Sequence, residues 1–258
     1  MALSIGCGTG SSDNSSDGNN TTAESGFSQS DIAGHWVGTL SPYDPEKEQR
    51  LFYVCADQNG NLVESVDSMA NQWYEYDATL GVEMKSSGEL LLSMLSNFND
   101  KNLLLHGKMS RAMNRIVGEY EFSTLTGQFV TGYFEMYNSD NIDVFSNFDF
   151  SGSWSGGFGI GRLKNKRLLT FNLDEYGNVL SGTLVNTETG NLIHNYSAGA
   201  GQLVIDDIDT GKIRNFTVVA DDGAIAECEY LLVDINQDFI AGTGIDSVVG
   251  AAMIEIRR

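Results

Sequence analysis

The sequence predicts an all-β protein that folds as two tandem antiparallel up-and-down barrels of about eight strands each, with two β-sandwiches as the alternative. Three observations predict this: a composition suited to many turns, alternation of apolar and polar residues, and an internal repeat. The chain has 258 residues with 29 Gly and 2 Pro, and 41% of them are hydrophobic. Abundant Gly, Asn and Asp favour tight turns between short strands. Closing an antiparallel meander removes its exposed edges, although a sandwich would show the same alternation.

The repeat begins with a tryptophan motif. Asp31–Thr39 reads DIAGHWVGT and Asp149–Gly157 reads DFSGSWSGG, so that Asp, Gly, Trp and Gly recur at an offset of 118 residues. Farther along, DQNGN at Asp57–Asn61 matches DEYGN at Asp174–Asn178 at an offset of 117. Matches that keep their order along the chain indicate a duplicated unit.

A third match lies near the end of each copy. GEYEFSTLTGQFVTG at Gly118–Gly132 aligns without gaps with CEYLLVDINQDFIAG at Cys228–Gly242, at an offset of 110. The shrinking offset predicts a small deletion in the second copy. We therefore expect residues 31–145 to form the first barrel repeat and residues 146–258 the second, without a long linker between them.

Alternation with period two predicts which side chains face each barrel interior. In the first two strands of the two copies, the predicted inward positions are Trp36, Gly38, Leu40, Phe52, Val54 and Ala56, and Trp154, Gly156, Phe158, Leu169, Phe171 and Leu173. Hairpin signals separate the strands, among them NGN at Asn59 and YGN at Tyr176.

The inward aromatic residues are the ligand-binding candidates. An eight-stranded barrel is just wide enough for its own side chains or for one small ligand. Large aromatic side chains dominate core packing, so these residues form either plain core or the wall of a pocket for a small apolar molecule. Glycines on the same face leave empty volume or admit a close approach. The candidates are Trp36, Phe52, Trp154 and Phe171.

The N-terminal residues Leu3–Cys7 (LSIGC) resemble the lipobox of bacterial lipoproteins, in which small residues precede an acceptor Cys. The resemblance implies that residues 1–6 are a residual signal peptide and that Cys7 is lipidated. Residues 7–30 are then the lipidated Cys and a flexible linker, since Ser, Asn, Asp, Gly and Thr dominate them. It further implies an outer-membrane lipoprotein of the bacterial cell envelope, periplasmic or surface-exposed, because Gly8 replaces the Asp that favours inner-membrane retention.

The Gly-x-Trp openings at Gly34–Trp36 and Gly152–Trp154 resemble the first motif of the lipocalin and calycin barrels. In that family the Trp of the first strand closes one end of the barrel, beneath a basic residue from the last strand. The resemblance implies that Arg257 or Arg258 takes this part in the second copy. The first copy has no obvious equivalent in its final strand.

Charge argues against nucleic acid as a partner. With 15 basic and 35 acidic residues, the formal net charge is −20, and such a surface repels phosphate backbones. Asp234–Asp238 (DINQD) has the oxygen spacing of a calcium loop but lacks the Gly and the distal Glu, so turn chemistry explains it better. We expect no metal and no cofactor.

The three cysteines, Cys7, Cys55 and Cys228, form no CxxC motif. Cys228 is interpreted as a small buried residue. A disulfide between Cys55 and Cys228 would have to cross the two copies, and the predicted strand faces disagree with it.

The sequence does not support catalysis. His35, His106 and His194 have no convincing nucleophile or ligand nearby in sequence, and GSWSG at Gly152 has Trp where a nucleophile elbow has Ser. The aromatic cluster at Asn71–Asp77 is interpreted as a strand rather than a sugar-binding platform.

We therefore predict a non-enzymatic, envelope-anchored lipoprotein that binds a small apolar ligand or an envelope protein partner. The membrane is a further partner, through the N-terminal lipid. The alternative is a structural or assembly lipoprotein with solid barrels and no ligand.

Overall fold

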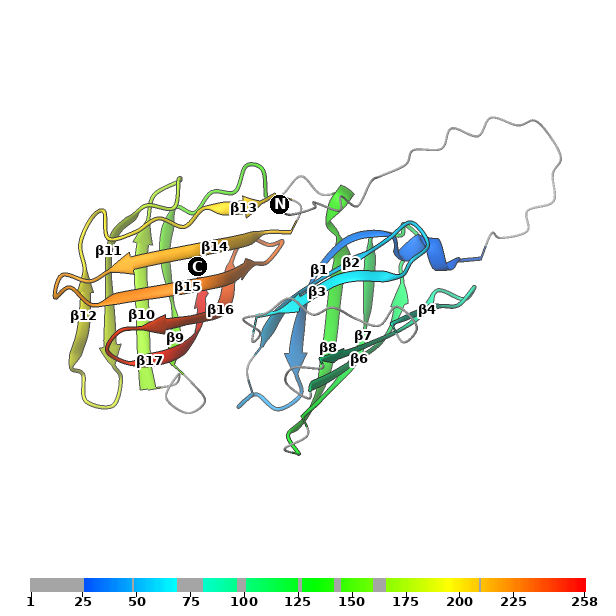
Figure 1. The fold of residues 1–258 in the computed structure, drawn as a ribbon, viewed down its shortest axis with the longest axis horizontal. Helices are drawn as coiled ribbons and strands as arrows, with labels where there is room; N and C mark the ends of the chain where they lie inside the picture. Colours follow the sequence, from blue (N-terminus) through cyan, green and yellow to red (C-terminus); the bar gives the residue numbers. More distant parts are fainter. Residues whose placement is uncertain are drawn as a thin grey trace, which may run out of the picture.

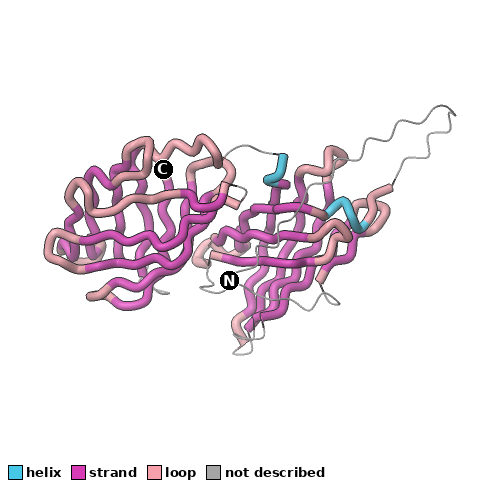
Figure 2. The backbone as a smooth tube through the Cα atoms, turned by 45° about the horizontal axis from the view of Figure 1, so that its top comes forward, coloured by secondary structure: helices cyan, strands magenta, loops and turns pink. Residues whose placement is uncertain are grey.

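The structure is a computed structural model, and it describes residues 26–47, 49–68, 81–96, 101–124, 127–141, 145–159, 166–208 and 210–258. These residues form two antiparallel sheets, one from each half of the chain, which lie side by side (Figure 1). Between the strands, the described residues form mainly turns, and two short 3₁₀ helices are complete among them, η1 (Gln29–Ile32) and η2 (Ser139–Asn141) (Figure 2). The predicted all-β class is confirmed.

The first sheet has eight strands in the order β3-β2-β1-β8-β7-β6-β5-β4, so the first and last strands of this half are neighbours. Its strands are β1 (Gly34–Pro42), β2 (Arg50–Ala56), β3 (Leu62–Asp67), β4 (Val82–Met84), β5 (Glu89–Ser96), β6 (Lys101–Met109), β7 (Arg115–Thr124) and β8 (Phe129–Asn138). We call this half the first unit.

The second sheet, or second unit, has nine strands in the order β12-β11-β10-β9-β17-β16-β15-β14-β13. They are β9 (Gly152–Gly159), β10 (Arg167–Leu173), β11 (Val179–Asn186), β12 (Leu192–Tyr196), β13 (Ile205–Asp207), β14 (Lys212–Val219), β15 (Ile225–Val233), β16 (Phe239–Asp246) and β17 (Gly250–Arg257).

The connection between β12 and β13 closes the second sheet. An isolated antiparallel bridge joins Gly201 to Val218 of β14, and another joins Asn178 to Gln202. In addition, the Asp221 amide donates to the Asn195 carbonyl at 2.8 Å. The second half therefore forms a nearly closed, barrel-like body, and the first half forms one eight-stranded antiparallel sheet. This arrangement agrees with the predicted tandem barrels.

The two units begin with the same local structure. The indole Nε1 of Trp36 donates to the Ile32 carbonyl at 2.9 Å, and that of Trp154 donates to the Phe150 carbonyl at 2.7 Å. In both cases the acceptor lies four residues earlier, so each buried N–H is satisfied by the chain that leads into the first strand.

The first hairpin turns also agree. Asp57 accepts from the Asn59 and Asn61 amides and from the Asn61 side chain, and Asp174 makes the same three bonds in its turn. Gly60 and Gly177 have φ of +77° and +79°, a conformation that favours glycine. The first two sequence matches therefore join equivalent structures.

The third sequence match joins hairpins that are not equivalent. It aligns β7–β8 with β15–β16, but β8 lies directly beside β1, whereas β17 separates β16 from β9. Gly38 pairs with Met136 and Gly156 with Ile256, so the counterpart of β8 is β17, at an offset of 120. The predicted deletion in the second copy is wrong. Neighbouring hairpins share one alternating pattern, so a match can slip by a whole strand.

Aromatic rings occupy the space that interior glycines leave. A Cβ atom on Gly38 would lie 2.6 Å from the ring of Phe52, the residue directly opposite it on β2. A Cβ atom on Gly182 would lie 2.6 Å from the ring of Phe171, again the residue opposite. The inward glycines thus serve close packing, because the rings fill the positions that larger side chains would take.

The Trp154 ring lies beneath the guanidinium of Arg258, whose Cζ is 5.1 Å from the ring centroid. Arg258 also donates to the carbonyls of Asp149 (2.8 Å), Ser151 (3.2 Å) and Gln237 (2.5 Å). A basic residue at the end of the chain therefore covers the Trp of the second unit, as the sequence led us to expect. In the first unit the position opposite Trp36 is Asn138.

We predict that Gly182→Ala lowers the free energy of unfolding by about 1–3 kcal/mol, because the added methyl overlaps the Phe171 ring. Phe171→Leu costs stability on its own. However, the double variant is more stable than the sum of the two single effects predicts, since the smaller side chain relieves the overlap. Urea unfolding of the original protein, the two single variants and the double variant measures this coupling. Strictly additive losses would contradict the packing of the Phe171 ring against Gly182.

Arg258→Ala is expected to lower the stability of the second unit by about 1–2 kcal/mol, through loss of the cation–π contact and of hydrogen bonds to carbonyls. Arg258→Lys should restore only part of this, because an ammonium cannot reproduce the planar fork. Denaturant unfolding followed by Trp fluorescence measures the loss. Arg214→Ala, at a solvent-exposed site of β14, is the control, and an equal loss there would contradict the expectation.

Candidate functional site: the cleft between the two units

Strand β2 joins the two units because it is buried on both faces. Phe52 and its alternate neighbours face the first interior, whereas Leu51, Tyr53 and Cys55 belong to the hydrophobic cluster of the second unit. The uninterrupted apolar run LFYVCA is the sequence signal for this burial, which alternation alone does not reveal.

A buried lysine sits in the same contact. The Nζ atom of Lys212, a residue only 2% exposed, lies 3.5 Å from Glu64 of the first unit and 3.8 Å from Asp207. It also lies 4.4 Å from the centroid of the Tyr53 ring. Burial lowers the pKa of Lys212, while the two carboxylates act in the opposite direction. The charged pair spans the units, so it ties one position of the first unit to one position of the second.

Beside this contact lies a cleft of about 570 Å³. Outward-facing residues of β1, β7 and β8 line it from the first unit, and the turn from Asp234 to Phe239 and Arg257 line it from the second. This volume falls within the range of small-molecule sites in proteins.

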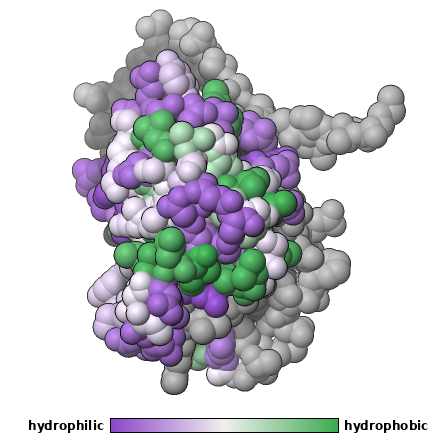
Figure 3. Space-filling model, turned by 90° about the vertical axis from the view of Figure 1, so that its left-hand side faces the viewer, coloured by the Kyte–Doolittle hydropathy of each residue, from purple (hydrophilic) through white to green (hydrophobic). Residues whose placement is uncertain are grey.

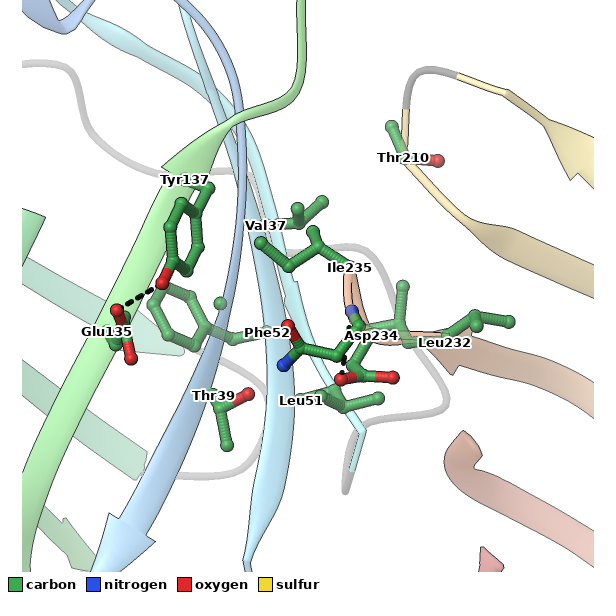
Figure 4. Close-up of a pocket in the computed structure, with 13 residues that line it drawn as sticks. Val37, Thr39, Leu51, Phe52, Glu135, Tyr137, Thr210, Leu232, Asp234 and Ile235 are labelled. Atoms are coloured by element: carbon green, nitrogen blue, oxygen red, sulfur yellow. Dashed lines mark hydrogen bonds between the residues drawn. The ribbon is translucent and has the colours of Figure 1, made fainter. Parts of the chain in front are cut away.

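A smaller recess of about 40 Å³ adjoins the cleft and shares Thr39, Glu135, Asp234 and Asn236 with it. Figure 4 shows it between strands of the first unit, which carry Glu135 and Tyr137, and the segment of Asp234 and Ile235 in the second unit. The Tyr137 hydroxyl donates to Glu135. The recess has room for little more than ordered water.

Aromatic side chains at the cleft are held in place although they are exposed. Tyr133, 58% exposed, meets Tyr43 edge to face, with ring centroids 4.6 Å apart and an interplanar angle of 85°. The Tyr43 hydroxyl donates to Glu119 Oε1 at 2.7 Å. This hydrogen bond, with the adjacent charge, raises the pKa of Tyr43 well above its ordinary value, so the phenol stays a donor.

On the side of the cleft formed by the second unit, Arg257 contacts both units. Its guanidinium lies 3.8 Å from the centroid of the Phe239 ring and donates to the side-chain oxygen of Gln49 in the first unit. This bond crosses the cleft wall from one unit to the other and places an amide and a guanidinium side by side.

Turn chemistry explains the Asp234–Asp238 loop, as predicted. Asp234 Oδ1 accepts from the amides of Asp238 (3.0 Å) and Phe239 (2.8 Å), and Oδ2 accepts from Asn236 (3.2 Å). Burial raises the pKa of Asp234. Its oxygens are engaged by the backbone, and no group of three or more His, Cys, Asp or Glu able to hold a metal occurs in the part of the chain that the structure describes.

The four predicted ligand-binding residues lie in the two cores. Trp36 and Trp154 are fully buried, and Phe52 and Phe171 are 1% exposed. Phe52 lines the small recess, and the 570 Å³ cleft is lined by other residues. Cys7 and the aromatic cluster 71–77 lie outside the described residues. Sequence reasoning missed the cleft, since its residues come from the polar faces of distant strands.

The surroundings of Cys228 show whether it forms a disulfide with Cys55. Cys228 is a free, buried thiol, and burial raises its pKa to about 12, so it is unreactive. Because Cys228 is free, it is not joined to Cys55.

Two histidines have carboxylate partners that sequence distance concealed. His194, 2% exposed, lies 3.0 Å from Asp222 and 3.6 Å from Asp246. His35 lies 3.2 Å from Asp140, and this contact helps to lower the pKa of that carboxyl against the effect of burial. Both histidines lie outside the lining of the cleft.

Two further surface features lie outside the contact between the units. A groove of about 360 Å³ crosses the outer face of β4–β7 and shares Glu119 with the cleft. On the second unit, Leu180, Ile245 and Val248 are exposed apolar side chains. Figure 3 shows hydrophobic side chains gathered in a band across the lower half of the face in view, with hydrophilic ones above and below.

No protein-family model matches the chain, and no curated protein matches it. Among solved structures, a protein of unknown function from the DUF3598 family of Nostoc punctiforme is 15% identical, with 90% of this chain and 99% of that chain covered and a TM-score of 0.29. A candidate AttH protein of Nitrosomonas europaea is 10% identical, with 92% and 98% covered and a TM-score of 0.27.

A candidate outer membrane protein of Bacteroides fragilis is also 10% identical, with 89% of this chain and 98% of that chain covered and a TM-score of 0.24. Structural similarities this weak do not indicate a function for this chain. Its function is therefore inferred from its own residues. Within the described residues, no helix combines the length and apolar character needed to cross a membrane.

We predict that Lys212→Met keeps the stability within about 1 kcal/mol of the original protein, because an apolar side chain of similar length removes the cost of burying a charge. Lys212→Ala should cost about 2–4 kcal/mol by leaving a cavity beside Tyr53. Glu64→Gln should cost an intermediate amount, since it removes one carboxylate from a buried ammonium. Thermal and urea unfolding rank the variants, and equal losses for Met and Ala would contradict this interpretation.

Proposed function

We propose that the protein is a non-enzymatic binding module of the bacterial envelope, tethered through Cys7, whose ligand occupies the cleft between the two units. The 570 Å³ cleft, with its exposed Tyr133 packed edge to face against Tyr43, carries the proposal. The tether rests on the lipobox-like LSIGC and the polar segment that follows it.

The packing of the two interiors supports a site outside the barrels. Trp36 and Trp154 are fully buried, and the rings of Phe52 and Phe171 fill the space beside interior glycines. A small apolar ligand inside a barrel would have to displace such side chains from a close-packed core. The outer cleft needs no such rearrangement, so it is the better place for a ligand.

A structural or assembly role without a ligand is the second candidate, favoured by the same filled interiors. In that case the outer strands would contact other envelope proteins, and the cleft would be incidental. The two candidates differ in whether the cleft itself is occupied in the envelope.

Site-specific photo-crosslinking tests the proposal. We expect a photoreactive phenylalanine in place of Tyr133 to give a discrete adduct in intact envelopes, because the ring lies in the cleft. The same residue in place of Tyr176, which is 67% exposed on a turn of the second unit, is the matched control and should give none. Equal adducts at both positions, or none at either, would favour the structural role.

The anchor is tested in the same strains. Acyl labelling should mark the protein, and Cys7→Ala should abolish the label, release the chain from the membrane fraction and reduce the adduct at position 133. A label that persists in Cys7→Ala, or a Cys7 sulfur that is found in a disulfide, would contradict the tether.

A further inference from the structure

The inter-unit cleft combines an exposed aromatic face with planar polar groups. Tyr133 lines the cleft and is 58% exposed, while its contact with Tyr43 and the Tyr43–Glu119 hydrogen bond restrict its movement. Because the ring is already ordered, little side-chain entropy is lost when a ligand covers it. The cleft is thus preorganised for a ligand with a flat, weakly polar face.

The charge distribution of the Tyr133 ring further restricts which ligands can bind the cleft. The face of an aromatic ring carries partial negative charge and attracts groups with partial positive charge. The C–H groups on one face of a pyranose are polarised in this way by the neighbouring oxygens. A sugar ring therefore suits the Tyr133 face better than a plain hydrocarbon does.

The polar groups around the ring fit hydroxyl groups. The Gln49 amide both donates and accepts, the Arg257 guanidinium donates, and the carboxylates of Glu119 and Asp238 accept. A hydroxyl is both donor and acceptor, so adjacent hydroxyls of a sugar can pair with such planar groups. Burying an apolar ligand here would instead remove water from the donor and acceptor positions of these groups that protein groups do not already fill, which is costly.

Charge decides which sugars fit. Glu119, Glu135, Asp234 and Asp238 line the cleft, and Arg257 is a cation among them. Arg115, which pairs with Glu135, contributes a second cation nearby. The excess of carboxylates disfavours phosphates and acidic sugars but tolerates hydroxyl and ammonium groups.

From these observations we propose that the cleft binds neutral or amine-bearing oligosaccharides, with one sugar ring stacked on Tyr133. The volume accommodates about two or three sugar rings, within the usual size of ligand pockets. This inference rests on the proposed function, since it names the ligand class for the same cleft.

Calorimetric titration of the full chain tests the proposal, with chitotriose and cellotriose as probes and trigalacturonic acid as the acidic counterpart. An array of neutral, amine-bearing and acidic oligosaccharides extends the set. We expect saturable binding of at least one neutral or amine-bearing oligosaccharide. Trigalacturonic acid should bind at least about tenfold more weakly, a difference of about 1.4 kcal/mol.

Three variants separate stacking from apolar contact. Tyr133→Phe keeps the ring and should bind within about twofold of the original, whereas Tyr133→Leu removes the π face and should weaken binding by about tenfold or more. Tyr176→Ala, outside the cleft, should leave binding unchanged. Unfolding curves verify that each variant is folded.

Several results would overturn the inference: no saturable binding across the array by the folded protein, unchanged binding by Tyr133→Leu, or strongest binding of the acidic sugars. A Lys-rich peptide is titrated in parallel. One outcome is that this peptide binds, that its binding requires Tyr133, and that no sugar binds. Another is that the crosslink at position 133 forms although no sugar binds. In either case the cleft is a binding site for another ligand class. The proposed function then stands and this inference fails.

Discussion

The burial of β2 on both faces is the constraint on which the arrangement of the molecule depends. One face of the strand carries Phe52 into the first core, and the other carries Leu51 and Tyr53 into the cluster of the second unit. A strand in this position cannot shift by one residue without exchanging its two apolar faces. The same packing brings the polar faces of β1 and β8 opposite the Asp234–Phe239 turn, so the cleft is a consequence of how the units pack.

Close packing of side chains inside the two units is consistent with a ligand site in the cleft outside them. Rings that lie across Gly38 and Gly182 allow close packing of the sheets, and close-packed cores resist the insertion of further groups. Such bodies are suited to hold surface residues in fixed positions. Tyr133 and Arg257 illustrate this, because each is exposed yet held through contacts that end on the packed strands.

The sequence predicted the features that depend on local patterns. The Trp motifs, the Asp57 and Asp174 turns and the inward aromatics were predictable because each is specified within a few residues. The hairpin match at Gly118 was assigned to the wrong strand, since neighbouring hairpins share one alternating pattern and only the pairing of β17 with β9 distinguishes them. The cleft was not predictable, because its residues meet only when one unit packs on the other.

The buried charge of Lys212 fixes the relative position of the two units, which apolar packing alone does not do. Apolar burial depends on area and is non-directional, so a contact made of Leu51, Tyr53 and their apolar neighbours alone would tolerate sliding. The Lys212–Glu64 pair has few acceptable positions, since a displaced ammonium would remain buried without its carboxylate. We infer that the pair fixes the register of the two units and that burying its charge costs some stability. A cleft formed by two separate units keeps its shape only if that register is fixed.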